Sequence, residues 1–210
     1  MRRSRRWASG TPTICAAGDS MFLLRRPNEE QIRRVLAVQK NHPFSYSDVD
    51  IASGNVRGDY NRDHNRTRLG EGAGVFERAV EAINRWEMFN IGWVELCWPD
   101  VPIATGSIVA VLASHVGFWS LNVCRIVSVI DEHSEFRRYG FIYGTLPDHA
   151  ERGQEQFSVE WRRTDDSVWY DILAYSRPNQ FLAKLGYPIA RWLQKRFARD
   201  SMAAMVRASI

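Results

Sequence analysis

Apolar residues recur with helical spacing in two segments near the start of the chain. Residues 27–41 begin with a proline and carry two glutamates where the first turn would lie, with aliphatic residues behind them. Residues 75–89 carry one apolar stripe, formed by Phe76, Val80, Ile83 and Trp86. We therefore predict two amphipathic helices. The polar, turn-rich segment 42–60 contains one candidate short strand at 44–49.

From residue 91 the period of the apolar pattern changes to two. Strand-like runs follow one another at 91–98, 107–114, 119–130, 139–146, 155–163 and 168–175. Short turn-rich segments separate these runs. Consecutive strands with short connections predict an antiparallel meander.

A long helix is predicted at the end of the chain, from Pro188 past Ala204, and its apolar side consists of Ile189, Trp192, Leu193 and Phe197. One face of the predicted sheet needs cover, and this helix is the long element left to cover it. The pattern therefore predicts an α+β helix-grip fold, in which a curved antiparallel sheet of about six or seven strands wraps around the C-terminal helix. Such a grip often leaves an apolar cavity between sheet and helix.

The first 20 residues differ in character from the rest. They hold four arginines against Asp19 and contribute +3 of the formal net charge of +4. They lack the apolar stretch that an export signal requires. A second methionine, Met21, opens the segment that has regular patterning. We interpret residues 1–20 as a dispensable or mis-assigned basic extension and residues 21–210 as a single domain, and we expect a cytoplasmic protein.

Composition narrows the class of protein. The 210-residue chain is 45% hydrophobic and 25% charged, which is typical of a globular protein. Its mean hydropathy of −0.35 and its short aliphatic runs argue against membrane-spanning helices. Beyond residue 20 the net charge is close to neutral, so we expect no nucleic-acid partner.

The sequence carries no local signature of a metal site, a cofactor or a catalytic group. Its three cysteines, Cys15, Cys97 and Cys124, are widely spaced, and the five histidines form no paired motif. The glycine-rich run 70–74 lacks the third glycine of a dinucleotide fingerprint and is better explained as the start of a helix. We expect no metal and no cofactor, and the sequence does not decide whether the protein is an enzyme.

Three longer motifs carry a resemblance to a known family. They are RLGEGAGVFER at 68–78, YGTLPDHAERG at 143–153 and DSVWYDILAYSRP at 166–178. Together they resemble the bacterial and plant family called domain of unknown function nineteen-ninety, over about residues 21–205. The resemblance implies a START-like, pollen-allergen-like helix-grip fold. That superfamily commonly binds lipids, sterols, hormones or polyketides, and some members act on them; it implies no catalytic residue here.

Arg125 is the first candidate for ligand binding. Strict alternation over 119–129 places it in the middle of an apolar strand face. An unpaired guanidinium there would be costly, so we expect a partner. The partner is either an internal carboxylate, such as Glu95 or Glu160, or an anionic group of a ligand.

Aromatic residues supply the other candidates. Tyr139, Phe141 and Tyr143 form a stripe at period two. The further aromatic residues that could line a cavity wall, with hydroxyl and indole groups to orient a ligand, are Trp161, Tyr170 and Trp192. Ordinary core packing explains the stripe equally well. The predicted ligand site therefore comprises Arg125, Tyr143, Trp161, Tyr170 and Trp192.

A hairpin around residues 164–167 brings two carboxylates together in the predicted register. A four-residue loop pairs Arg163 with Val168, and hence Glu160 with Asp171. Like charges directly opposite are unfavourable unless a proton is shared or a cation intervenes. With Arg162 nearby, we favour a solvated, salt-bridged face over an acid/base pair.

Basic residues at spacing four, Arg191, Lys195 and Arg199, mark the last helix. A solvated face is the favoured interpretation, and docking to an anionic membrane or an acidic partner is the alternative. Taken together, we expect binding of a small hydrophobic, lipid-like or polyketide-like ligand. The rival hypotheses are a cyclase-like or hydratase-like enzyme on the same scaffold and an interaction module without a cavity that uses the basic helix.

Overall fold

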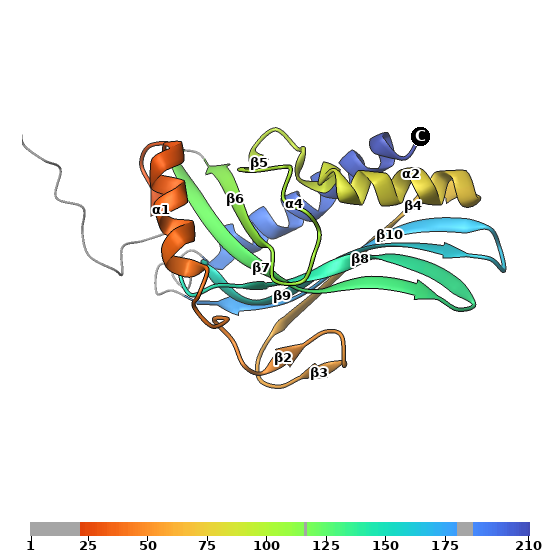
Figure 1. Cartoon of the computed structure of the whole chain (residues 1–210), viewed down its shortest axis with the longest axis horizontal. Coiled ribbons are helices and arrows are strands. Elements are labelled where there is room, and N and C mark those ends of the chain that lie inside the picture. Colours follow the sequence, from red (N-terminus) through yellow and green to blue (C-terminus); the bar gives the residue numbers. More distant parts are fainter. Residues whose placement is uncertain (1–21, 116, 180–186) are drawn as a thin grey trace, which may run out of the picture.

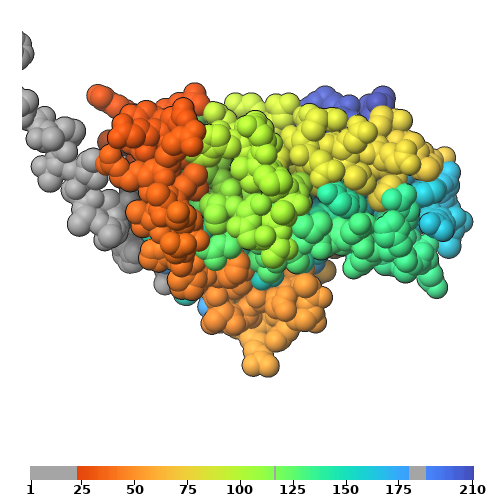
Figure 2. Space-filling model, in the orientation of Figure 1, coloured from red at the N-terminus to blue at the C-terminus, as the bar shows by residue number. Residues whose placement is uncertain are grey.

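A curved antiparallel sheet organises the chain in the computed structural model, which describes residues 22–115, 117–179 and 187–210 (Figure 1). Its strands are β1 (Phe22–Leu23), β4 (Asn61–Glu71), β5 (Val94–Leu96), β6 (Ile108–His115), β7 (Phe118–His133), β8 (Phe136–Thr145), β9 (Glu151–Arg162) and β10 (Ser167–Pro178). Their order across the sheet is β4-β10-β9-β8-β7-β6-β5, and β1 pairs with β7 beside this path. A separate hairpin of β2 (Val49–Asp50) and β3 (Asn55–Val56) projects from the body (Figure 2).

Helices cover both faces of the sheet. The helical elements are α1 (Glu29–Gln39), α2 (Ala73–Asn84), the short 3₁₀ helix η1 (Glu87–Phe89) and α4 (Tyr187–Ala208). On one face α2, η1 and α4 bury the main core, which includes Phe76, Phe157 and Met205. On the other face α1 packs on β6 and β7, where Ile32 joins a smaller apolar cluster. The predicted α+β helix-grip fold is confirmed.

Local chemistry explains where the first two helices begin. Asn28 caps α1, because its side chain accepts from the backbone N–H of Gln31 and the Gln31 side chain accepts in return from the backbone N–H of Asn28, both at 2.9 Å. Gly72 precedes α2 with a φ of +86°, a conformation that favours glycine. The glycine-rich run thus turns β4 into α2.

The second helix ends earlier than its apolar stripe predicts. Trp86 adopts a left-handed φ of 58°, and η1 follows it. Its indole Nε1 donates to the carbonyl of Val101 at 2.9 Å, and its ring packs edge-on against Phe141. This tertiary packing stabilises the break where local periodicity would continue the helix.

Strand β4 is the longest element that the apolar pattern does not predict. Its sequence, NRDHNRTRLGE, has almost no apolar residue, yet it forms the edge of the sheet beside β10. Its side chains satisfy charges on neighbouring elements; Arg66, for example, pairs with Glu160 on β9. An edge strand stabilised by ion pairs shows no alternation of apolar residues, so sequence periodicity could not reveal it.

The β9–β10 register differs from the predicted one by two residues. Val168 pairs with Trp161, Trp169 with Glu160, and Asp171 with Ser158. The four-residue loop lies one position earlier than predicted, and Asp165 stabilises it by accepting from the Ser167 backbone N–H and hydroxyl. A shift of two keeps every side chain on its predicted face but separates Glu160 from direct opposition to Asp171.

Arginine side chains neutralise the carboxylates of Glu160 and Asp171, which agrees with the favoured interpretation of a salt-bridged face. Glu160 accepts from Arg66, Arg138 and Arg162, each at 2.8 Å, and Arg66 also reaches Asp171 at 3.3 Å. Burial by itself raises the pKa of Glu160, but the three guanidiniums more than offset this effect and hold the pKa at about 2. Glu160 is 6% exposed, whereas the side chains of its three arginine partners are 26–44% exposed. The carboxylate is therefore buried, while the arginines extend from it toward solvent, so the prediction of a solvated face holds only for the arginines.

Candidate functional site

A cavity of about 810 Å³ lies between the sheet and α4. This volume falls in the usual range for small-molecule pockets. Its apolar wall consists of Phe89, Val94, Val111, Ala113, Ile172, Ala174, Leu193, Phe197 and Ala198. Leu24 and Ile189, which are 88% and 62% exposed, also line it, so the cavity reaches the surface there.

A carboxyl group and a phenol meet on the sheet wall. Tyr143 on β8 and Glu155 on β9 are register partners, so their side chains lie on the same face. The hydroxyl of Tyr143 donates to Glu155 Oε2 at 2.7 Å. Burial raises the pKa of Glu155 to about 7; the hydrogen bond from Tyr143 opposes this effect, and the nearby Glu151 and Asp63 add to it. Glu155 therefore exchanges its proton near neutral pH.

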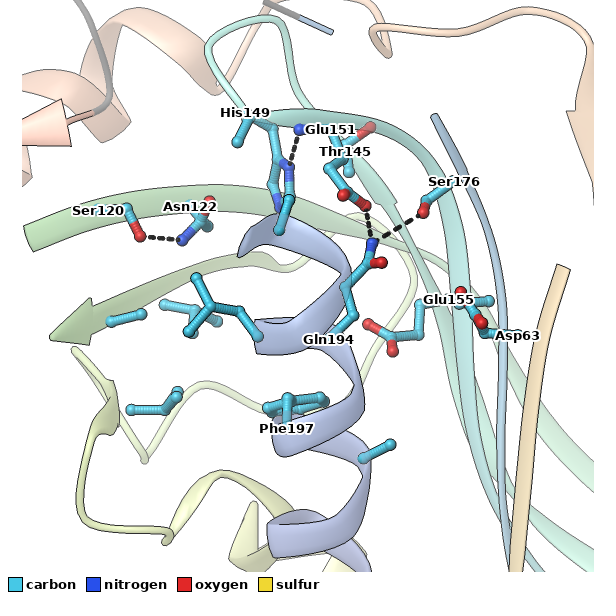
Figure 3. A pocket seen from close by; sticks show the side chains of 18 of the residues that line it. Asp63, Ser120, Asn122, Thr145, His149, Glu151, Glu155, Ser176, Gln194 and Phe197 are labelled. Atoms are coloured by element: carbon cyan, nitrogen blue, oxygen red, sulfur yellow. Dashed lines mark hydrogen bonds between the residues drawn. The ribbon is translucent and has the colours of Figure 1, made fainter. Parts of the chain in front are cut away.

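Gln194 connects α4 to the sheet inside the cavity (Figure 3). Its amide donates to the carboxylate of Glu151 and, at 3.1 Å, to Ser176 Oγ, while its carbonyl oxygen accepts from Arg191 at 2.6 Å. Burial raises the pKa of Glu151, while hydrogen bonds with Ser176 and Gln194 and the positive charge of Arg191 partly oppose the rise. Arg191 in turn donates to both carboxylate oxygens of Asp63 on β4, with Nη2 and Oδ1 at 2.6 Å. These contacts hold one side of the helix against β4, β9 and β10.

His149 contributes a neutral ring to the cavity wall. Its Nδ1 accepts from the backbone N–H of Glu151 at 3.1 Å, which leaves the ring proton on Nε2. Burial lowers the pKa of His149 to about 4, although the backbone hydrogen bond opposes the shift. The neutral ring, which projects into the space above α4, offers a hydrogen-bond donor at neutral pH (Figure 3).

A second polar group lies on β6 and β7. Ser120 Oγ is 2.8 Å from His115 Nε2 and accepts from the Asn122 side chain at 3.2 Å. Burial lowers the pKa of His115, and the positive charge of Arg196 lowers it further. Polar groups thus occupy separate regions of the cavity wall, between apolar side chains, as is typical of small-molecule pockets.

Comparison with known proteins places the chain in a family. A family model described as domain of unknown function (DUF1990) matches residues 45–204. The chain belongs to this family. A UPF0548 protein of Dictyostelium discoideum is 34% identical over 206 residues, which cover 90% of this chain and 95% of that protein. A UPF0548 protein of Arabidopsis thaliana is 31% identical over 198 residues, covering 87% and 94%.

Two solved structures are similar to this DUF1990 chain at low identity. Ara h 8.0201 has 11% identity and a TM-score of 0.42, with 71% of this chain and 99% of that chain covered. The major latex-like protein 151 of Panax ginseng has 16% identity and a TM-score of 0.40, with 73% and 99% covered.

Of the five predicted ligand-site residues, the structure brings Tyr143 to the cavity wall. Tyr170 is fully buried in the core, where its hydroxyl lies 3.0 Å from Ser201 Oγ. Trp161 packs against Phe76 and donates from its indole to Asp166 at 2.8 Å. Both aromatic residues therefore serve the packing of sheet and helices.

Arg125 and Trp192 lie away from the cavity wall. Arg125 Nη2 donates to the carbonyls of Lys40 and His42, each at 2.8 Å, and the guanidinium lies over the ring of Phe44. Its partners are thus backbone carbonyls, whereas the sequence suggested a carboxylate or a ligand. Because the neighbouring Cys124 lines the cavity, alternation turns Arg125 to the other face of the sheet. Trp192 is 59% exposed, beside the guanidinium of Arg196.

Sequence reasoning missed the acidic groups of the cavity. Glu155 lies on the same face of β9 as Phe157, Val159 and Trp161, which point toward the core. The same alternation argument that selected Arg125 would therefore have selected Glu155. Asp63 and Gln194 gave no such signal, because they come from a strand without apolar alternation and from the edge of a helix face.

Metal-ligand clusters and membrane-spanning helices are both absent from the described part of the chain. Residues 22–115, 117–179 and 187–210 contain no group of three or more His, Cys, Asp or Glu side chains arranged to hold a metal ion. None of the described helices is both long and apolar enough to cross a membrane.

Proposed function

We propose that the protein binds a small, largely apolar, lipid-like or polyketide-like molecule in the cavity between the sheet and α4. The observation that carries this proposal is the cavity of about 810 Å³, whose exposed wall area is mainly apolar, although polar side chains also line it. Burial of apolar ligand surface contributes roughly 25 cal/mol per Å², so a ligand that buries about 300 Å² gains about 7 kcal/mol before the cost of association. The polar groups, with Tyr143 among them, would orient one end.

A cytoplasmic location is part of the same proposal. Cys97 and Cys124 are free thiols, and Cys124 is buried beside the cavity. Free thiols are typical of reducing compartments. We continue to expect no nucleic-acid partner.

Binding of the neutral dye Nile red by the full chain tests the proposal. Leu193→Trp adds bulk to the cavity wall, and Val38→Trp adds the same bulk on α1, where Val38 is 57% exposed. We expect saturable binding that weakens at least tenfold in Leu193→Trp and is unchanged in Val38→Trp. Mass spectrometry of compounds released from the natively purified protein would then identify the ligand class. Absence of saturable binding, or equal binding by both variants, would contradict the proposal.

A second candidate, an enzyme on this scaffold, is favoured by one specific observation. Glu155 titrates at about 7 in contact with Tyr143, and the neutral His149 lines the same cavity. Such groups perform general acid/base chemistry on a bound ligand. Turnover of the released compound, abolished in Glu155→Gln while binding persists, would support this candidate. The interaction-module hypothesis assumed a filled core, and the cavity argues against it.

A further inference from the structure

One oxygen of Glu155 is available to a ligand. Oε2 accepts from Tyr143, whereas Oε1 has no hydrogen-bond donor among the described residues. The carboxyl group points from β9 across the cavity toward α4 (Figure 3). A molecule in the cavity therefore meets a carboxyl oxygen to which none of the described residues donates a hydrogen bond.

The charges around this oxygen favour a cation. Glu155, Glu151 and Asp63 bring three carboxyl groups to this end of the cavity, and the carboxyls of Glu151 and Asp63 raise the pKa of Glu155. Arg191 is the basic partner in this cluster, and Asp63 engages it through both guanidinium Nη atoms. Arg62 on β4 and Lys195 on α4 also line the cavity, but both residues are exposed at the surface. An anionic ligand group would add to the negative charge, whereas a cationic group would neutralise it.

We propose that the ligand is an amphiphile with an apolar body and a protonated amine, and that its ammonium group pairs with Glu155 in the cavity. This inference rests on the proposed function, because it assumes that the cavity holds a ligand. Phe89, Leu193 and Phe197 provide the apolar wall for the body of the molecule. An ammonium group donates in several directions, so it can bond Oε1 and still satisfy other acceptors at this end.

Protonation of Glu155 should control the affinity for such a ligand. Its pKa of about 7 means that the carboxylate is lost as the pH falls below neutrality. An ammonium ligand that needs the carboxylate should therefore bind about tenfold more weakly for each pH unit below 7. The other titratable and charged groups at this cavity are Glu151, His149, Tyr143, Tyr170, Cys124, Asp63, His64, His115, Arg62, Arg191 and Lys195.

Several of these groups keep one charge state across pH 6–8. His149 stays neutral because burial lowers its pKa to about 4. Tyr143, Tyr170 and Cys124 stay protonated because burial raises the pKa of each well above its usual value. A variant that removes only the charge of Glu155 separates its effect from the rest.

Three naphthalene probes that differ in charge test the inference on the full chain. They are 2-(2-naphthyl)ethylamine, 2-(2-naphthyl)ethanol and 2-naphthylacetic acid, and their dissociation constants are measured by calorimetry at pH 8 and pH 6. At pH 8 we expect the amine to bind at least tenfold more tightly than the alcohol, and the acid more weakly than both. Between pH 8 and pH 6 the amine should lose about tenfold in affinity, while the alcohol changes less than twofold.

Glu155→Gln should remove the preference for the amine over the alcohol, together with the pH dependence of amine binding. Glu29→Gln, at an exposed position on α1, is the matched control and should bind all three probes as the wild type does. If Glu155→Gln does not fold, the ranking of the probes and the pH profile of the wild type still decide the matter. Equal affinity for amine and alcohol, or tightest binding of the acid, would overturn the amine inference but leave the proposed function intact. Failure of all three probes to bind would count against both.

Discussion

Removal of the ionisable group of Glu155 should change how the stability of the protein depends on pH. In the folded state the pKa of Glu155 is about 7, against 4.5 for an unperturbed glutamate. The folded state therefore binds more protons than the unfolded state between these two pH values. Unfolding free energy is then lost as the pH rises through this window, and the loss is complete above pH 7.

The magnitude follows from the size of the shift. A pKa difference of about 2.5 units corresponds to about 3 kcal/mol at 1.36 kcal/mol per unit. Glu155→Gln cannot ionise, and its amide oxygen can still accept from Tyr143. From pH 4 to pH 8 the unfolding free energy of the variant, taken relative to the wild type, should therefore rise by about 3 kcal/mol.

Urea unfolding of both proteins at half-unit pH intervals measures this difference. The comparison must be made between variant and wild type, because His149 has the opposite dependence and partly cancels the slope of the wild-type curve. Glu29→Gln, which removes only an exposed ion pair with Arg33, should change the unfolding free energy by less than about 1 kcal/mol across this range. Parallel curves for Glu155→Gln and the wild type would refute the reasoning, because they would mean that burial does not perturb this carboxyl group.

Three further changes have defined outcomes. The folded pKa of His149, about 4, lies below its unperturbed value of 6.5, so the wild type should lose about 3 kcal/mol of unfolding free energy as the pH falls from 6.5 to 4. His149→Gln should not show this loss, and thermal melts of both proteins at pH 7 and pH 4 measure the difference. Glu160→Gln should cost about 3 kcal/mol in urea unfolding at pH 7, since it removes the buried carboxylate that three arginines share. Glu132→Gln, at the exposed partner of Arg138, should cost under about 1 kcal/mol, and equal costs would contradict the argument. Gly153→Ala should destabilise the protein by more than about 2 kcal/mol, because the added Cβ would lie 1.8 Å from the Tyr175 carbonyl oxygen. Gly92→Ala, also at positive φ but in open space, should cost only about 1 kcal/mol. A melting temperature of Gly153→Ala equal to or higher than that of Gly92→Ala would contradict this prediction.

Local sequence patterns predicted most of the helices and strands. Period-two runs located β6 to β10 within a few residues, and the proline at the start of the last helix located α4 to one residue. These signals are readable because each element buries one face against the core, and burial imposes its period on the sequence. The like-charged pair at Glu160 and Asp171 was placed on the right face but in the wrong register, since a one-residue shift of the loop moves the pairing by two.

Elements that are not stabilised by a local apolar face were not predictable in this way. The edge strand β4 gains its stability from β10 and from ion pairs to residues nearly one hundred or more positions away, such as Arg66 with Glu160 and Asp63 with Arg191. The break at Trp86 depends on the Val101 carbonyl and on Phe141. Both partners lie too far along the sequence to be indicated by a pattern that spans one or two helical turns.

The sequence by itself determined the fold class, because alternation in the strands and one terminal helix leave few ways to bury the apolar surface. Only the tertiary structure decided which side chains surround the cavity. In the sequence, Arg125 and Glu155 are both charged residues within apolar strand faces. In the structure, Arg125 donates to backbone carbonyls just before Phe44, whereas Glu155 faces the cavity and accepts from Tyr143. Alternation distinguishes the two faces of a strand, whereas the packing of the distant α1 and α4 decides which face becomes filled and which remains open.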